Sequence, residues 1–209
     1  MKKLKTECAV LGMVSTNCYF ACNTETNETI IIDPADDAFA IRNWCMNSGK
    51  KPAAILLTHG HFDHMMAADE LRKELSIEIY VSEAEVELLG NPLDNLSGRW
   101  SSPATLKADV LLKDGQILSL AGFKIRAIAT PGHTKGGMCY YFEEENVLFS
   151  GDTLFNGSYG RVDFPTSSMS EMKNSIREKL LVLPEETAVY PGHGEATTIG
   201  YEKAYNPLA

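Results

Sequence analysis

The sequence has no long apolar segment, few cysteines and no excess of basic residues. No stretch approaches the roughly 18 consecutive apolar residues that a membrane-spanning helix needs. The sequence therefore predicts no membrane partner. The apolar run at 8–14 is short and contains a glycine, so we interpret it as a first β-strand.

Cysteine occurs only five times in 209 residues, and no two cysteines have the CxxC spacing. Small secreted proteins that depend on disulfides have dense, even-numbered cysteines, and this chain has neither feature. We therefore expect a cytoplasmic protein, in which the close pair Cys18 and Cys22 are buried, chemically inert thiols. Cys139 follows His133 closely, but its surroundings do not indicate a catalytic cysteine.

Basic residues are fewer than acidic ones, 19 against 28, which gives a net charge of −9. Such a surface repels phosphate backbones, which argues against a nucleic-acid partner and against a nuclease. The composition, 44% hydrophobic and 22% charged, is otherwise that of an ordinary globular protein. We expect one domain over residues 1–209, and the sequence leaves its oligomeric state open.

The apolar pattern predicts two similar blocks of secondary structure. Further strands are predicted at 18–23, 29–33, 53–57, 77–81, 110–112, 116–120, 123–128, 137–143, 147–150 and 187–190. Helices are predicted at 36–48, 64–75 and 83–89, and a last one begins at a capping box formed by Ser168 and Glu171. Two sheets, each covered by helices, would give an α+β fold, a four-layer αββα sandwich.

Histidine is also scarce, and its five positions are informative. Three histidines, His59, His61 and His64, lie within six positions around Asp63, and the others are His133 and His193. Each group follows an apolar run that we interpret as a strand. Loops after strands can converge on one edge of a sheet, where a rigid frame holds a site.

A lone histidine is usually a surface residue or a satisfied core residue. That interpretation does not explain why three of them crowd beside an aspartate while no histidine occurs elsewhere. Neutral imidazole is the commonest zinc ligand, so the pattern favours a metal site. Asp152 also follows an apolar run and lies beside a glycine. Alone it would indicate only a turn, but beside the histidines it becomes a candidate ligand.

The HxHxDH pattern at 59–64, followed in order by His133, Asp152 and His193, resembles the metallo-β-lactamase fold superfamily. The resemblance covers residues 58–194. Within the superfamily the chain is similar to the glyoxalase II (hydroxyacylglutathione hydrolase) group, and to its short, single-domain bacterial type. The stretches at 150–155, 160–164 and 191–200 carry this closer resemblance.

The resemblance implies a catalytic centre with two metal ions. Metal 1 would be held by His59, His61 and His133, metal 2 by Asp63, His64 and His193, and Asp152 would bridge them; Asp63 is also assigned to catalysis. Nitrogen and oxygen ligands suit Zn²⁺ best, and Fe or Mn stays open. The absence of a cysteine ligand argues against the β-lactamases of the superfamily.

Two adjacent metals lower the pKa of a shared water from about 15.7 towards 7, so that hydroxide can attack a carbonyl. The expected reaction is hydrolysis of a small thioester or a related acyl ester. By resemblance, Arg161 would help to bind an anionic thioester, although a surface ion pair with Asp163 is an equally good interpretation. Tyr159 is a second candidate for substrate binding, or an ordinary exposed aromatic residue.

Two other functions compete with the hydrolase. One is a mononuclear iron persulfide dioxygenase of the same fold, in which His133 and Asp152 pair with His59 or His61. The other is a metal-binding module without catalysis. The complete second set of ligands favours the hydrolase over both, and an open site favours catalysis over a structural role.

Overall fold

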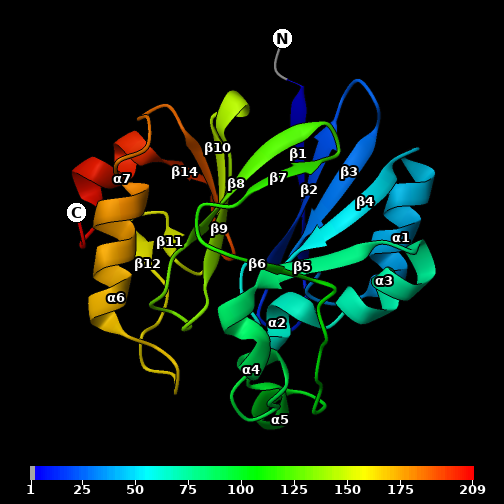
Figure 1. Cartoon of the computed structure of the whole chain (residues 1–209), viewed down its shortest axis with the longest axis horizontal. Coiled ribbons are helices and arrows are strands. Elements are labelled where there is room, and N and C mark those ends of the chain that lie inside the picture. Colours follow the sequence, from blue (N-terminus) through cyan, green and yellow to red (C-terminus); the bar gives the residue numbers. More distant parts are fainter. Residues whose placement is uncertain (1–2) are drawn as a thin grey trace.

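In the computed structural model, which describes residues 3–209, two six-stranded sheets pack together between outer helices (Figure 1). The first sheet has the order β1 (Leu4–Leu11), β2 (Thr16–Asn23), β3 (Glu28–Ile32), β4 (Lys51–Leu56), β5 (Glu78–Ser82) and β6 (Val110–Leu112). The second has the order β14 (Thr197–Thr198), β13 (Ala188–Pro191), β10 (Val147–Gly151), β9 (Met138–Phe142), β8 (Phe123–Ala129) and β7 (Ile117–Leu120).

The outer helices lie on opposite sides of the molecule (Figure 1). One side has α1 (Ala38–Asn47) and α3 (Ala68–Leu75), and the other has α6 (Met169–Asn174), its π-helical continuation η3 (Ser175–Leu180) and α7 (Ile199–Tyr205). Short elements lie between them: α2 (Phe62–Met65), η1 (Glu83–Glu85), α4 (Val86–Leu89), α5 (Ser97–Trp100), η2 (Glu143–Glu145), and the hairpin of β11 (Leu154–Phe155) and β12 (Ser158–Tyr159).

Three separate hydrophobic clusters correspond to the three contacts between layers. One joins the first sheet to α1 and α3, and includes Phe20 and Leu71. The second lies between the two sheets, with Tyr140 and Phe149 fully buried. The third joins the second sheet to α6 and η3. Each sheet buries both faces, which confirms the predicted four-layer αββα sandwich.

The strands beside the site are nearly continuous apolar runs because they are buried on both faces. Strands β3, β4, β5 and β6 are parallel to one another, as are β10 and β13. Their carboxyl ends therefore meet at common edges, and the loops that follow them can supply one site.

Most predicted elements are present, with two corrections. The first strand covers Leu4–Leu11 instead of 8–14, because Gly12, at φ 71°, already belongs to the turn before β2. The helix predicted at 64–75 is divided into α2 and α3. The backbone N–H of Ala67, between them, donates to the carbonyl of Pro34 instead of continuing the helix. Helices α5 and α7 were not predicted.

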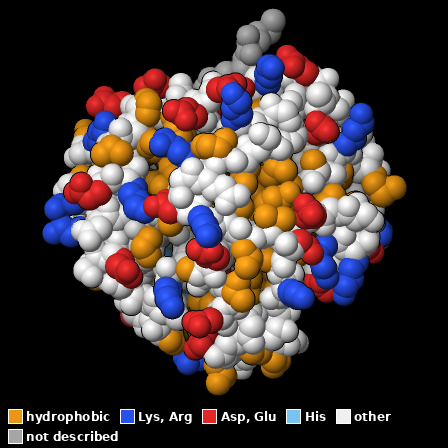
Figure 2. Space-filling model, viewed as in Figure 1, with side chains coloured by type: hydrophobic (Ala, Val, Ile, Leu, Met, Phe, Trp, Pro, Cys, Tyr) orange, Lys and Arg blue, Asp and Glu red, His pale blue; other side chains and the backbone are white. Residues whose placement is uncertain are grey.

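Among the described residues, no helix is both long and apolar enough to cross a membrane. Acidic and basic side chains are interspersed over the face that Figure 2 shows, with apolar side chains scattered between them. That face has no continuous basic area of the kind that binds nucleic acid.

Candidate metal centre

All seven predicted ligands come together, and each lies in a loop or short helix just after a strand. His59, His61, Asp63 and His64 follow β4, with His61 at the start of α2. His133 follows β8, Asp152 follows β10, and His193 follows β13. The loops after three strands of the second sheet thus meet the motif after a strand of the first.

The ligand atoms form three overlapping groups, within each of which they lie no more than 4.8 Å apart. We call His59, His61 and His133 cluster 1, and Asp63, His64 and His193 cluster 2. Both match the predicted division. The third group places Asp152 beside His59 and His64.

Asp152 lies between the two clusters, and its two oxygens face different histidines. Its Oδ1 is 3.5 Å from Nε2 of His64, and its Oδ2 is 3.5 Å from Nε2 of His133 and 3.6 Å from Nε2 of His193. One carboxylate is therefore within reach of ions held by either cluster.

The buried atoms at the centre fit metal ions better than they fit one another. Nε2 of His59, His61 and His64 and Oδ1 of Asp152 have no hydrogen-bond partner among the described residues, although all four atoms are buried. Nδ1 of His61 lies 2.9 Å from Nε2 of His133. Buried polar atoms without partners are costly unless something binds them. Neutral nitrogens converging with carboxylates are the donor set that divalent zinc, iron and manganese accept.

The opposite ring nitrogens of these histidines are held by the protein. Nδ1 of His64 lies 2.9 Å from Oδ2 of Asp33, and Nδ1 of His133 lies 2.9 Å from the backbone carbonyl of Arg161. Nδ1 of His59 lies 3.2 Å from the Thr58 hydroxyl. Such partners fix the ring orientation and the tautomer, so that Nε2 is presented to the metal.

Asp33 is a positioning residue that we did not predict. It is buried, it adopts a left-handed backbone at φ 51°, and it also accepts from the backbone and hydroxyl of Thr58. A non-glycine residue in this region is strained, and such strain persists where the surroundings require it. The available signal was its place directly after the apolar β3, the same position that marks the ligands.

Glu85 is a second unpredicted residue, and it joins the two loops that carry cluster 1. It is fully buried, and its Oε2 accepts from the backbone N–H of Gly60 at 2.9 Å. Its Oε1 accepts from the Thr134 hydroxyl at 2.6 Å and from the backbone N–H of Gly136 at 2.7 Å. Gly60 separates His59 from His61, and Thr134 follows His133. The sequence around Glu85 is that of an ordinary helix start, so nothing there indicated this role.

Cluster 1 is electrostatically different from cluster 2. Burial, with the neighbouring histidines, holds the pKa of His59 and of His61 well below the ordinary value. Burial also lowers the pKa of His133. These rings are therefore neutral at physiological pH, as metal ligation requires.

Cluster 2 contains and adjoins carboxylates, which reverse the effect of burial. Burial alone would lower the pKa of His64, but Asp63, Asp152 and Asp33 together raise it to about 10. His193 also has a raised pKa, because its bond to Asp63 outweighs its burial. In turn, His64 and His193 outweigh the burial of Asp63 and lower the pKa of its carboxyl group.

The loop that carries His193 is tied to the first sheet. The Asn17 side chain donates to the carbonyls of Pro191 and Gly194, both at 2.9 Å, and the Asn17 backbone N–H donates to that of Gly192. A β-carbon at Gly192 would collide with Asp152 and His64, so glycine is required there. The first sheet and the His193 loop of the second sheet are therefore in direct contact beside cluster 2.

A cavity of about 240 Å³ opens over the two clusters. Arg161, for which we expect a role in substrate binding, lines it, and its guanidinium forms a two-bond ion pair with Asp163 at 2.9 and 2.7 Å. Tyr159 packs against the third hydrophobic cluster and is not among the residues that line the cavity.

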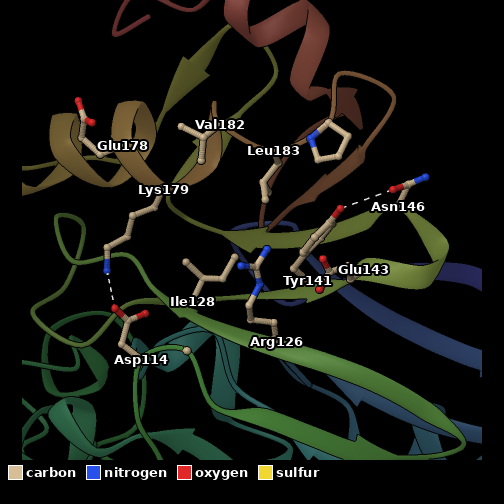
Figure 3. Close-up of a pocket in the computed structure, with 12 residues that line it drawn as sticks. Asp114, Arg126, Ile128, Tyr141, Glu143, Asn146, Glu178, Lys179, Val182 and Leu183 are labelled. Atoms are coloured by element: carbon tan, nitrogen blue, oxygen red, sulfur yellow. Dashed lines mark hydrogen bonds and ion pairs between the residues drawn. The ribbon is translucent and has the colours of Figure 1, made fainter.

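A larger hollow of about 640 Å³ lies away from the clusters, between the second sheet and η3 (Figure 3). Lys179 pairs with Asp114 across it, and Arg126 stacks on Tyr141. Its lining contains no histidine or cysteine. The smaller cavity is therefore the one connected with metal chemistry.

The sequence matches the family described as the metallo-beta-lactamase superfamily over residues 11–193. It is 36% identical to the probable metallo-hydrolase YqgX of Bacillus subtilis over 95% of this chain and 94% of that one. It is 37% identical to the hydroxyacylglutathione hydrolase GloC of Haemophilus influenzae over 92% of each.

Solved structures agree with this match. One named BLEG-1 B3 metallo-beta-lactamase has a TM-score of 0.93 and 41% identity, covering 98% of this chain and 99% of that one. The structure of TTHA1623 in a di-iron-bound form has a TM-score of 0.85 and 33% identity, covering 97% of this chain and 100% of that one. The structure of ETHE1 from Myxococcus xanthus has a TM-score of 0.80 and 25% identity, covering 97% of this chain and 83% of that one. Together with the ligand geometry, these matches show that the chain belongs to the metallo-beta-lactamase superfamily and is a metallo-hydrolase of that superfamily.

Proposed function

We propose that the protein is a thioester hydrolase of the glyoxalase II type, with two divalent metal ions at clusters 1 and 2. The observation that supports this most is the pair of ligand clusters, with Asp152 placed between them. The similarity to GloC favours a hydroxyacylglutathione thioester or a related acyl ester as substrate.

The side chains divide the work. Asp33, Thr58 and the Arg161 carbonyl orient imidazoles towards the ions. Two divalent ions bound there would lower the pKa of water towards 7 and polarise the carbonyl of the substrate. The Thr16 hydroxyl donates to Oδ2 of Asp63 at 3.0 Å and limits rotation of that carboxylate. Asp63, placed between Thr16 and His193, is thus oriented for the catalytic role that we assign to it.

Zinc is the metal that we propose first, because its preferred ligands are those present here. The di-iron form of TTHA1623 makes iron the second candidate. The free state of all five cysteines suits the cytoplasmic location that we also propose.

Metal analysis combined with a substrate panel tests this function. Protein purified without added metal should contain two metal equivalents per chain and should hydrolyse hydroxyacylglutathione thioesters. A single iron with oxygen-dependent release of sulfite from a persulfide would assign it to the dioxygenase instead. A β-lactam belongs in the panel because of the similarity to BLEG-1, and preferential β-lactam hydrolysis would contradict a thioester function.

Arg161 is our candidate for contact with an anionic substrate, and its pairing with Asp163 offers a matched test. Arg161→Ala should raise KM more for anionic thioesters than for neutral ones, because a cation is lost. Asp163→Asn should lower KM for the same anionic thioesters, since it frees the guanidinium. Equal effects on anionic and neutral substrates would show that Arg161 does not bind the anion.

A further inference from the structure

The cavity over the metal ligands has walls that are largely apolar. Aromatic and aliphatic side chains from five separate segments line it: Val14, Phe62, Leu96, Trp100, Phe155 and Phe164. Apart from the ligands themselves, Arg161 is the one charged residue in the lining, and it is already paired. Pockets that bind organic molecules typically combine such walls with a few polar groups.

Two of these side chains lie directly against the ligands. The Phe164 ring is 5.3 Å from the His61 ring and 5.8 Å from the His133 ring, centre to centre, in edge-on arrangements. The Phe155 ring is 6.1 Å from the His193 ring. The apolar surface is therefore continuous with the place where a carbonyl would react.

Leu96 contributes to the wall at a conformational cost. It adopts φ 69°, a region that bulky residues rarely occupy, and its side chain is almost fully buried beside the cavity. A strained, non-glycine residue beside a reaction site points to a role there. Glycine or asparagine would adopt this backbone with less strain, but the position is occupied by leucine, whose side chain lines the cavity.

A buried polar framework holds the segment around Leu96 in place. The side chain of Asn95 accepts from the backbone N–H of Ser97 and donates to the carbonyl of Ala104. The backbone carbonyl of Asn95 accepts from Phe62, at the start of α2. The segment is thus hydrogen-bonded to the helix that carries Asp63 and His64, which connects the wall to the ligands.

Trp100, at the end of α5, remains 56% exposed, and Val14, in the turn after β1, remains 40% exposed. Large apolar side chains left open around a cavity lose contact with water when a ligand covers them. An apolar ligand that covered Trp100 and Val14 would therefore be stabilised by the burial of their apolar surface, whereas a charged ligand would not.

We propose that this cavity is a subsite for an uncharged, apolar arm of the substrate, so that the enzyme acts on acyl derivatives with an alkyl or aryl group. The inference rests on the hydrolase function proposed above and narrows its substrate class. Leu96 and Trp100 are the specificity-determining residues, and the phenylalanine rings bring the arm up to the reacting carbonyl.

The test uses the metal-loaded full chain and neutral thioesters of N-acetylcysteamine. One series lengthens the acyl group from acetyl to hexanoyl, and the other lengthens the thiol side. In at least one series, kcat/KM should rise with each added methylene, by up to about fourfold, the factor for full burial of the group. A flat response in both series would overturn the proposal.

Trp100→Ala should reduce the dependence on chain length, and Trp100→Phe should restore part of it. Phe39→Ala is the matched control, because Phe39 is a similarly exposed aromatic residue, 62%, on the outer helix α1. It should leave the dependence unchanged. Equal effects of Trp100→Ala and Phe39→Ala would contradict the assignment of Trp100.

Binding of thioethers, which cannot be hydrolysed, separates this inference from the proposed function. Hexyl thioethers of N-acetylcysteamine should bind more tightly than ethyl ones in calorimetry, and Trp100→Ala should remove the difference. If no thioester is hydrolysed but this preference is present, the subsite stands and the function fails. If thioesters are hydrolysed without any preference, the function stands and the subsite fails.

Discussion

Cluster 1 and cluster 2 have similar ligands but opposite electrostatic settings. In cluster 1, burial keeps three imidazoles neutral, and Glu85 ties their loops together through hydrogen bonds to Gly60 and Thr134. In cluster 2, carboxylates surround His64, and His193 is 27% exposed. The comparison teaches that cluster 1 offers buried, neutral nitrogen donors, whereas cluster 2 combines carboxylates with a histidine that is open to solvent.

The largest effect on metal content and on hydrolysis should come from removing Asp152, the carboxylate that lies between the two clusters. Asp152→Ala should lower the metal content from two equivalents to less than one, and should reduce hydrolysis by more than about 100-fold, beyond the usual loss for an outer partner. Elemental analysis and steady-state kinetics measure the two effects. Asp114→Ala, in the hollow of Figure 3, is a control that should change neither. Retention of two ions by Asp152→Ala would show that Asp152 is no bridge.

The next largest effect should be a difference between the two clusters in the rate of metal release. Because His193 is partly exposed and His59, His61 and His133 are buried, a chelator should remove one ion quickly and the other slowly. His193→Ala should eliminate the fast phase, and His133→Ala the slow phase, in a stopped-flow assay with a coloured chelator. Equal release rates in the unaltered protein would remove the distinction that we draw.

Glu85→Gln tests whether the framework behind cluster 1 matters to metal binding. Glu85 accepts three hydrogen bonds, and an amide would present N–H groups to one of these donors, which should weaken metal affinity by about 10- to 100-fold. Metal competition titrations measure this change.

Glu202 offers a matched control for that variant. It is also fully buried, and it accepts from Gly157, Thr197 and Asn206, away from both clusters. Glu202→Gln should lower thermal stability while leaving metal affinity unaltered. If both variants lose metal equally, the effect of Glu85 is one of general stability.

The smallest effect should appear in the stability of metal-free protein against pH. The pKa of His64 is about 10 when folded and 6.5 otherwise, so its contribution is complete below 6.5 and is lost between 6.5 and about 10. His59 has a lowered pKa, so the unfolded chain takes up its proton below 6.5 and stability falls there. His64→Gln should flatten the alkaline decline of Tm, and His59→Gln the acidic one. If both variants changed the pH dependence of Tm in the same way, the opposite pKa shifts of His64 and His59 would be contradicted.

The sequence identifies the seven candidate ligands that the structure brings together, because such chemistry depends on residue type and on a place directly after apolar strands. It predicts the two layered sheets for a similar reason, since alternating and continuous apolar runs reflect burial. It does not reveal Glu85, whose role depends on two loops that are distant in sequence. It also does not reveal Leu96, because nothing in a leucine indicates a left-handed backbone.

The Arg161 side chain shows a further limit of the sequence. Its proximity to the site could be anticipated by resemblance, and its pairing with Asp163 was one of two interpretations, but the sequence could not show that the paired guanidinium also lines the cavity. Its backbone carbonyl, which orients His133, could not be anticipated at all, since any residue has a carbonyl.

Each cluster takes ligands from both halves of the chain, and Asn17 joins the His193 loop to the opposite sheet. A metal ion bound at either cluster would hold the two halves of the chain together, since the ligands of each cluster come together only when the halves are docked. Binding then adds to the free energy of unfolding, by about 2.7 kcal/mol for an ion at 100 times its Kd. The supply of metal in the cell would thus set how long the protein survives proteases, besides setting how fast it works.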